Sequence, residues 1–253
     1  MTTITATEAH QRISNMQAMP GNKGLDGGLV VFPIDVYYFS GTRQNSTLWI
    51  PVEGDPLLLV RKSLARAMKE SVLADIRPFP SSKDFPALFD EHVQKTGFTF
   101  DVAPVQQLNY YSNPLTGREF VDISPLNREL RSVKTGFERE KLRQSGGMLC
   151  PVFAQAPQFT RAGMAEQAGL GQYFMGMPGE QARFVGHGVG LELDEFPVIA
   201  QGFKALLLAG QTIAIEPKFV IPGKGAIGIE NTFAVTPTGG EKITGMPDDI
   251  VFL

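Results

Sequence analysis

The sequence of 253 residues contains little cysteine and little excess charge. Its single cysteine, Cys150, excludes an intramolecular disulfide and a zinc site built from several thiolates, and it is typical of a reducing cytoplasm. Lysine and arginine number 23 against 26 aspartate and glutamate residues, for a net charge of −3, and no cluster of five basic residues occurs. Because phosphate binding needs a positive field, this composition argues against a nucleic-acid partner.

Long apolar runs are also missing. The longest runs, at residues 57–60 and 205–209, fall far short of the ~20 residues that span a bilayer, and we interpret them as core strand and turn segments. The first eight residues have neither the basic start nor the apolar run of a signal peptide. We therefore expect a cytoplasmic protein with no membrane partner, and its length suits one or two globular domains.

The first half of the chain alternates helical and extended patterns. Glu53-Gly54-Asp55 separates two extended segments and signals a hairpin. The predicted elements are helices at 7–19, 63–71 and 84–96, a strand at 25–32, and hairpin strands at 45–52 and 56–60. This alternation predicts a compact α/β domain through about residue 130, with residues 124–134 as the linker to the rest.

The second half opens with a helical pattern over residues 137–153. Gly146, Gly147 and Pro151 each lower helix propensity by about 1 to 3 kcal/mol relative to alanine, which predicts a break near Cys150. From Arg183 onward, short apolar segments alternate with glycine-bearing turns, a pattern typical of antiparallel strands. The whole chain is therefore predicted to be α+β.

Three segments near the end place one histidine and two glutamates on consecutive extended stretches. They are Gly186-His187-Gly188, Ile215-Glu216-Pro217 and Gly228-Ile229-Glu230. The glycines around His187 let the backbone approach another group closely, which favours a chemical role for this histidine. A carboxylate that enters an apolar strand needs a cation or a hydrogen-bond partner. One imidazole and two carboxylates suit Mn²⁺, Fe²⁺, Co²⁺ or Zn²⁺, so we predict a metal site.

Other chemistry in this region is less well supported. The glycines at 186, 188 and 190 do not form a phosphate loop, because no Lys-Ser/Thr pair follows and nearby carboxylates would repel an anion. Those carboxylates, Glu192, Asp194 and Glu195, are interpreted as a polar rim. Cys150 has no adjacent histidine or basic residue and is interpreted as an inert core thiol. The two remaining histidines, His10 and His92, are predicted to be surface residues.

Residues 186–197, 209–220 and 225–236 resemble the last three signature strands of a metallopeptidase family. This family contains Xaa-Pro aminopeptidases, prolidases and methionine aminopeptidases, and it has the creatinase-like pita-bread fold. Residues 37–41 and 120–124 are similar to its small N-terminal domain. The resemblance implies a creatinase-type α/β domain over residues 1–130 and an incomplete pita-bread domain over residues 131–253.

The same resemblance implies roles for four residues. His187, Glu216 and Glu230 match metal ligands of the family, and the carboxylate at the position of Glu216 also handles a proton, so His187 and Glu216 are the catalytic candidates. Asp194 stands where many relatives carry a histidine that contacts the substrate. The implied substrate is a peptide that contains proline, and the implied assembly is a homodimer.

The chain departs from the family at two further ligand positions. Relatives hold two ions with five ligands, and two of these are aspartates in a D-x-G stretch and a T-D-x-T/S-R stretch. Neither stretch occurs between Lys134 and Leu170, which implies an internal deletion near Met164/Ala165. We therefore expect at most one divalent ion, with Mn²⁺ as the first candidate.

Three functions are compatible with these motifs. The first is hydrolysis of the peptide bond before proline by a metal-dependent peptidase, with activity lost where the aspartates are missing. The second is a catalytically dead relative, with one ion or none, that acts as a binding module. The third is a creatinase-like amidinohydrolase, which shares the fold without metal, and the intact His187, Glu216 and Glu230 count against it.

Overall fold

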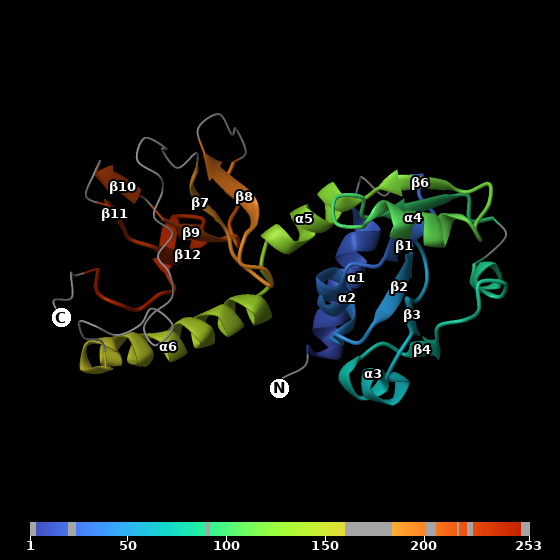
Figure 1. The fold of residues 1–253 in the computed structure, drawn as a ribbon, viewed down its shortest axis with the longest axis horizontal. Coiled ribbons are helices and arrows are strands. Elements are labelled where there is room, and N and C mark those ends of the chain that lie inside the picture. The colour runs from blue at the N-terminus through green and yellow to red at the C-terminus, as the bar shows by residue number, and fades with distance from the viewer. Residues whose placement is uncertain are drawn as a thin grey trace. The chain divides into compact units, whose positions relative to one another are not determined.

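A computed structural model describes residues 4–19, 24–89, 92–159, 184–200, 206–216, 218–221 and 225–248 (Figure 1). The chain folds as two compact units, Met1–Leu130 and Arg131–Leu253. Each unit is built around its own main sheet.

The first unit is a six-stranded sheet in the order β4-β3-β2-β1-β5-β6. The pairs β1-β2 and β2-β3 are antiparallel, and the other three pairs are parallel. Its strands are β1 Gly27–Val30, β2 Ser46–Pro51, β3 Leu57–Val60, β4 Asp75–Pro78, β5 Lys95–Phe98 and β6 Glu119–Asp122. Its helices are α1 Ala6–Ala18, α2 Pro33–Ser40, α3 Leu64–Glu70, the 3₁₀ turn η2 Phe85–Leu88, α4 Val105–Ser112 and α5 Ser124–Ser132.

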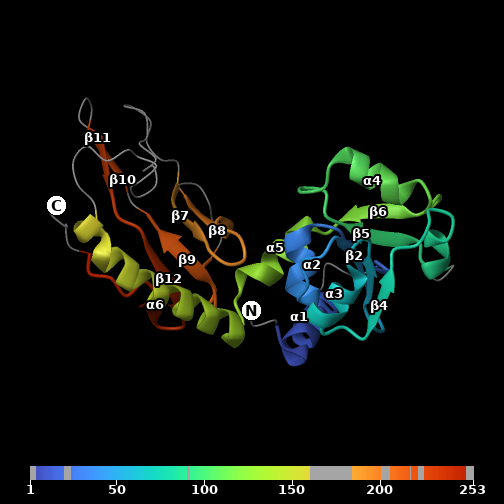
Figure 2. The ribbon, with the colours of Figure 1, turned by 60° about the horizontal axis from the view of Figure 1, so that its bottom comes forward.

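Helices cover both faces of this sheet (Figure 2). Successive side chains of a strand point to opposite faces, and in β1 Val30 joins one apolar cluster whereas Leu29 joins the other. The cluster around Val30 includes residues of α1, α2 and α3, and the cluster around Leu29 includes Phe85 and Tyr111 from η2 and α4. The unit is therefore a layered α/β domain with a core on each side of the sheet.

Some of the predicted elements of this unit are confirmed. The helix predicted at 7–19 is α1, and the predicted hairpin is β2 and β3. The helix predicted at 84–96 is wrong, because the described residues of this stretch form η2 and then enter β5. Strand β5 pairs with β1 and β6, and a Cβ on its Gly97 would come within 2.6 Å of Ile123. Pairing along both edges outweighs the local helical pattern.

The linker predicted at 124–134 is largely helical. Helix α5 covers Ser124–Ser132, and its Leu126 and Leu130, spaced by four residues, pack against the cluster around Val30. The side-chain amide of Asn127 also donates to buried Asp35 at 3.0 Å. Contacts with the core therefore stabilise a segment whose composition reads as a linker.

The second unit contains an antiparallel five-stranded sheet in the order β13-β12-β9-β7-β8, and a two-stranded hairpin. The antiparallel strands predicted after Arg183 are thereby confirmed. The elements are α6 Gly136–Phe159, β7 Phe184–Gly188, β8 Glu195–Ala200, β9 Thr212–Ile215, β10 Lys218–Ile221, β11 Gly225–Gly228, β12 Asn231–Thr236 and β13 Gly239–Lys242. Residues 206–208 are exposed, so the core role predicted for 205–209 is wrong for its described part.

Helix α6 is continuous through Pro151, so the predicted break near Cys150 is wrong. The helix begins with a reciprocal cap, in which the Thr135 hydroxyl accepts from the backbone N–H of Glu138 and the Glu138 carboxylate accepts from that of Thr135. A Cβ at Gly146 would come within 2.9 Å of the Ile243 carbonyl oxygen. This glycine therefore lets α6 pack closely, and capping and packing outweigh its low propensity.

Candidate metal and catalytic site

His187 lies on β7, between β8 and β9 in the five-stranded sheet, and is 6 % exposed. Its flanking glycines allow close approach of the neighbouring strands, as predicted. A Cβ at Gly186 would lie 2.3 Å from the Ala214 carbonyl oxygen, and one at Gly188 would lie 2.3 Å from that of Phe196. Any larger residue at either position would separate the strands around the imidazole.

Hydrogen bonding fixes which nitrogen of His187 faces the site. Nδ1 lies 2.9 Å from the Gly188 carbonyl oxygen, which can only accept, so we assign the hydrogen to Nδ1. In the neutral ring Nε2 then carries a lone pair. Nε2 lies 3.2 Å from Oδ1 of Asp194 and 3.9 Å from Oε1 of Glu216. The Nε2 lone pair therefore faces two carboxylates. A cation shared by these three groups, either a proton or a metal ion, would stabilise the arrangement.

The two glutamates lie next to paired strand ends, Glu216 just after β9 and Glu230 just before β12. Pairing of His187 with Ala214 places its side chain on the same face of β9 as Glu216, two residues beyond Ala214. Strand β12 pairs Asn231 with Ile215, and one further step of that register brings Glu230 opposite Glu216. Glu216 is mostly buried, with its side chain 12 % exposed, whereas Glu230 is exposed.

Contacts join His187 to Asp194 and Glu216, and strand register brings Glu230 to the same end of the sheet. Within the described ranges, no three His, Cys, Asp or Glu side chains are gathered closely enough to hold a metal ion. The implied deletion near Met164/Ala165 lies outside the described residues, as does the side chain of Cys150. His10 and His92 are exposed, as predicted.

A buried ion cluster beside His187 was not anticipated from the sequence. Glu195 was interpreted as part of a polar rim, but its side chain is only 5 % exposed. Its Oε1 accepts from Nη2 of Arg131 at 2.5 Å, and its Oε2 accepts from Nζ of Lys134 at 3.0 Å. Arg131 also donates to Glu192 at 2.6 Å. The partners lie more than 60 residues apart in sequence, so no local pattern could have revealed them.

Burial and charge act differently on the two ends of this cluster. Burial alone would raise the pKa of Glu195, but the attraction of Lys134 and Arg131 outweighs it, so the pKa is lowered and the carboxylate stays ionised. Burial lowers the pKa of Lys134, and its pairing with Glu195 offsets only part of that effect. Glu195 is therefore a fixed negative charge held by two cations.

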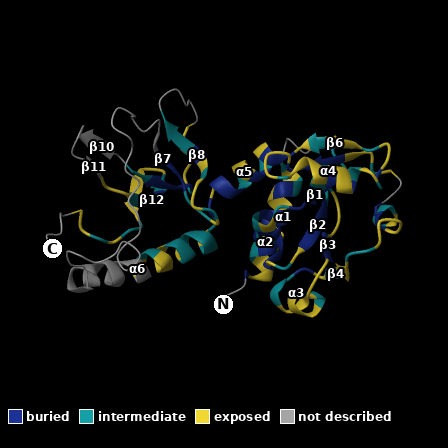
Figure 3. Cartoon of the chain, viewed as in Figure 1, coloured by how far each residue is buried: buried dark blue, intermediate teal, exposed yellow. Residues whose placement is uncertain are grey.

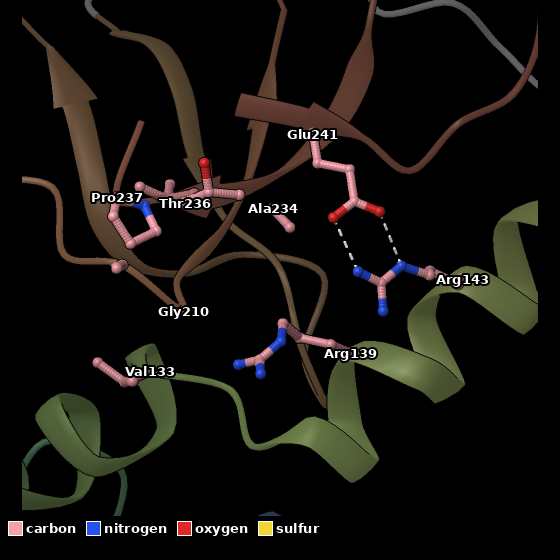
Figure 4. A pocket seen from close by; sticks show the side chains of 10 residues that line it. Val133, Arg139, Arg143, Gly210, Ala234, Thr236, Pro237 and Glu241 are labelled. Carbon is pink, nitrogen blue, oxygen red and sulfur yellow. Dashed lines mark hydrogen bonds and ion pairs between the residues drawn. The ribbon is translucent and has the colours of Figure 1, made fainter. Parts of the chain in front are cut away.

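A pocket of about 320 Å³ lies elsewhere on the second unit, and none of the four predicted site residues lines it (Figure 4). Arg143 donates two hydrogen bonds to Glu241 there, at 3.0 and 2.8 Å, and these bonds lower the pKa of Glu241. Arg139 donates to the Lys134 carbonyl oxygen at 2.5 Å. The charged groups that line this pocket thus already have partners within the chain.

Comparison with known proteins identifies both units. Residues 12–133 match the creatinase/prolidase N-terminal domain, and residues 153–237 match metallopeptidase family M24. The Xaa-Pro dipeptidase of Pyrococcus furiosus is 30% identical over 126 residues, which cover 45% of this chain and 34% of that protein. The Xaa-Pro dipeptidase of Lactobacillus delbrueckii subsp. lactis is 38% identical over 77 residues, which cover 30% of this chain and 19% of that protein. The matched segments thus span about a third or less of these relatives.

Solved structures show the same fold. An Xaa-Pro dipeptidase from Bacillus anthracis aligns with a TM-score of 0.83 and 18% identity, covering 97% of this chain and 100% of that one. The prolidase from Pyrococcus horikoshii aligns with a TM-score of 0.80 and 16% identity, covering 95% and 100%. The architecture is therefore a creatinase-type domain followed by part of a pita-bread metallopeptidase domain.

Both parts of the chain thus resemble the metallopeptidase family of prolidases and aminopeptidases P. The match to family M24 implies a divalent metal ion. None of the described helices has both the length and the apolar character that crossing a bilayer requires.

Proposed function

We propose that this chain carries the site of a metal-dependent Xaa-Pro peptidase, with His187, Glu216 and Glu230 as metal ligands. The observation that carries the proposal is the orientation of His187. Its Nδ1–H is bonded to the Gly188 carbonyl oxygen, so Nε2 faces the carboxylate oxygens of Asp194 and Glu216, 3.2 and 3.9 Å away. A backbone acceptor on the second nitrogen is the usual partner of a histidine that binds metal.

The donor set fits one divalent ion in its chemistry. Imidazole and carboxylate ligands suit Mn²⁺, the first candidate, and also Co²⁺, Fe²⁺ and Zn²⁺. Two of the proposed ligands already approach each other, since Oε1 of Glu216 lies 3.9 Å from Nε2 of His187.

In this proposal each residue has a distinct role. His187, Glu216 and Glu230 would hold a divalent ion, which when bound would supply an acidified water and polarise the scissile carbonyl. His187 keeps its ring orientation through the Gly188 carbonyl oxygen, and Glu216 holds the transferred proton on its carboxylate. Asp194, with its side chain 74 % exposed, is free to contact a peptide that contains proline.

Charge limits the site to one ion. Two divalent ions about 3.5 Å apart repel by roughly 19 kcal/mol at an effective dielectric constant of 20. In family members with five ligands, two further aspartates help to compensate this charge, and their D-x-G and T-D-x-T/S-R stretches do not occur between Lys134 and Leu170. We therefore propose at most one ion and no useful turnover by this chain, so that it binds proline peptides without hydrolysing them.

A second candidate function is that of a metal-free binding module. It is favoured by the absence, among the described side chains, of three ligands already gathered around one point. Uptake of Mn²⁺ by the purified chain separates the two candidates. We also propose a homodimer, which light scattering on the full chain would test.

The test of the proposed function is hydrolysis of a dipeptide that ends in proline, with added Mn²⁺ or Co²⁺. We expect no useful turnover by this chain, and turnover after an Asp-bearing hairpin is inserted between Met164 and Ala165. In the version with the insert, Glu230→Gln should remove activity. Glu241→Gln, which changes an exposed glutamate of β13, should keep it.

One set of results would contradict the proposal of an inactive chain. If this chain itself turns over the dipeptide, is inhibited by a chelator and loses activity on Glu230→Gln, then it assembles a working site from other carboxylates. Asp194 would be the first residue to examine, and the proposal of an inactive chain would have to be abandoned.

A further inference from the structure

Several hydrogen bonds hold the loop between β7 and β8, residues 189–194, and the carboxylate of Glu195 at its end accepts one of them. Glu195 accepts from the backbone N–H of Glu192 through Oε1 at 3.1 Å, and the Glu192 carbonyl oxygen accepts from the N–H of Gly190 at 3.1 Å. The Glu195 carboxylate therefore lies folded back beneath the loop that carries Asp194. The loop takes its shape around this group.

Gly190 provides the space for that carboxylate. A Cβ at this position would lie 2.4 to 2.8 Å from the carboxyl atoms of Glu195, closer than any real contact. An alanine at position 190 and the observed position of Glu195 therefore exclude each other. The glycine is explained by the position of the carboxylate beneath it.

Two cations on a fixed backbone hold Glu195 from the other side. The Lys134 side chain is 1 % exposed, and its ammonium reaches Oε2 of Glu195. The backbone of Lys134 is itself tied down, because its N–H donates to the Gly210 carbonyl oxygen at 2.9 Å and its carbonyl oxygen accepts from Arg139. Arg131 adds the second charge at Oε1. Buried, charge-assisted hydrogen bonds of this kind are strong and directional.

We propose that Glu195, clamped by Arg131 and Lys134, is a positioning residue that sets Asp194 against the Nε2 atom of His187. Asp194 is adjacent to Glu195 in the chain, so a displacement of Glu195 moves the carboxylate that lies 3.2 Å from Nε2. The clamp acts on the site without touching substrate or metal. This inference rests on the proposed function for its metal-binding readout, and its structural readouts are independent of that function.

The test uses the full chain and two complementary variants. Glu195→Gln removes the negative charge at nearly constant shape, and Gly190→Ala displaces the carboxylate while keeping every charge. Glu241→Gln is the matched control, because it breaks an exposed ion pair of the same unit. Three readouts apply to each protein: hydrogen exchange of the Glu192 backbone N–H, the ¹⁵N resonance of His187 Nε2, and Mn²⁺ affinity by calorimetry.

We expect both variants to speed exchange of the Glu192 N–H at least tenfold, to shift the His187 resonance, and to weaken Mn²⁺ binding about 10- to 100-fold. The control should match the unchanged protein in all three. If Glu195→Gln does not fold, Gly190→Ala decides the matter alone.

The inference is overturned if Gly190→Ala folds and leaves both the Glu192 exchange rate and the His187 resonance unchanged. If the unchanged protein takes up no Mn²⁺, the proposed function fails. The positioning role of Glu195 is then tested by the Glu192 exchange rate and the His187 resonance alone. A change in both supports this role, and no change in either refutes it.

Discussion

The two units bury different kinds of side chain, and Figure 3 marks the buried residues of each unit in dark blue. In the first unit, apolar side chains fill both faces of the sheet. In the described part of the second unit, Ile213, Ala214 and Ala234 are the buried apolar residues, and the buried polar residues include His187, Lys134 and Arg131. The first unit is therefore stabilised mainly by its apolar core. Among the described residues of the second unit, polar and charged side chains form a larger share of the buried ones.

The largest expected effect breaks the core of the first unit. Phe39 is buried in the cluster around Val30 and makes an edge contact with Tyr38, with ring centroids 4.9 Å apart. Phe39→Ala should lower the free energy of unfolding of this unit by about 3 to 5 kcal/mol, because it leaves a cavity. The only tryptophan, Trp49, lies in the same unit, so its fluorescence during urea unfolding reports this change. Exposed Val105→Ala is the control and should leave the midpoint unchanged.

The second unit should respond more strongly to loss of a charge than to trimming of its apolar core. Lys134→Met leaves Glu195 with one cation fewer, and we expect a loss of about 3 kcal/mol in the free energy of unfolding. Ile213→Val removes one buried methyl group and should cost about 1 kcal/mol. Hydrogen exchange of the β9 amides measures the loss in free energy of unfolding for each variant. A larger effect from Ile213→Val would reverse the contrast between the units.

A smaller effect is expected at a polar site of the first unit. Glu70 accepts hydrogen bonds from the Thr42 hydroxyl at 2.7 Å, from Arg66 and from Gln44, which lower its pKa from 4.5 to about 2. Because the pKa is lowered in the folded state, this carboxylate stabilises the unit above about pH 4.5, and the stabilisation is lost as the pH falls toward 2. The difference in urea midpoint between the unchanged protein and Glu70→Gln should therefore shrink between pH 5 and pH 2. A constant difference across this range would exclude the linkage.

The sequence indicates the parts of the site that a short motif can encode. The glycines around His187 predicted close strand approach, and Glu216, on a neighbouring strand, does lie near that histidine. The roles of His187, Glu216, Glu230 and Asp194 stay predictions. The clamp on Glu195 was missed because its partners come from distant parts of the chain. Such pairs are set by tertiary packing, which local patterns do not record.

The same limit explains the errors in the fold. Residues 95 and 96, predicted to end a helix, lie in β5, where Ile123 leaves no room for a Cβ on Gly97. Helix α6 continues through Pro151, and it packs closely against Ile243 at Gly146. The contacts with Ile123 and Ile243 join each segment to a partner that its own sequence does not reveal.

Metal uptake tests the central claim most directly. Calorimetric titration of the full chain with Mn²⁺ should give a stoichiometry of one, because two glutamates cannot compensate a pair of divalent ions. His187→Ala should abolish the binding, and exposed His10→Ala should preserve it. Two tightly bound ions per chain, or equal binding by His187→Ala, would contradict the account.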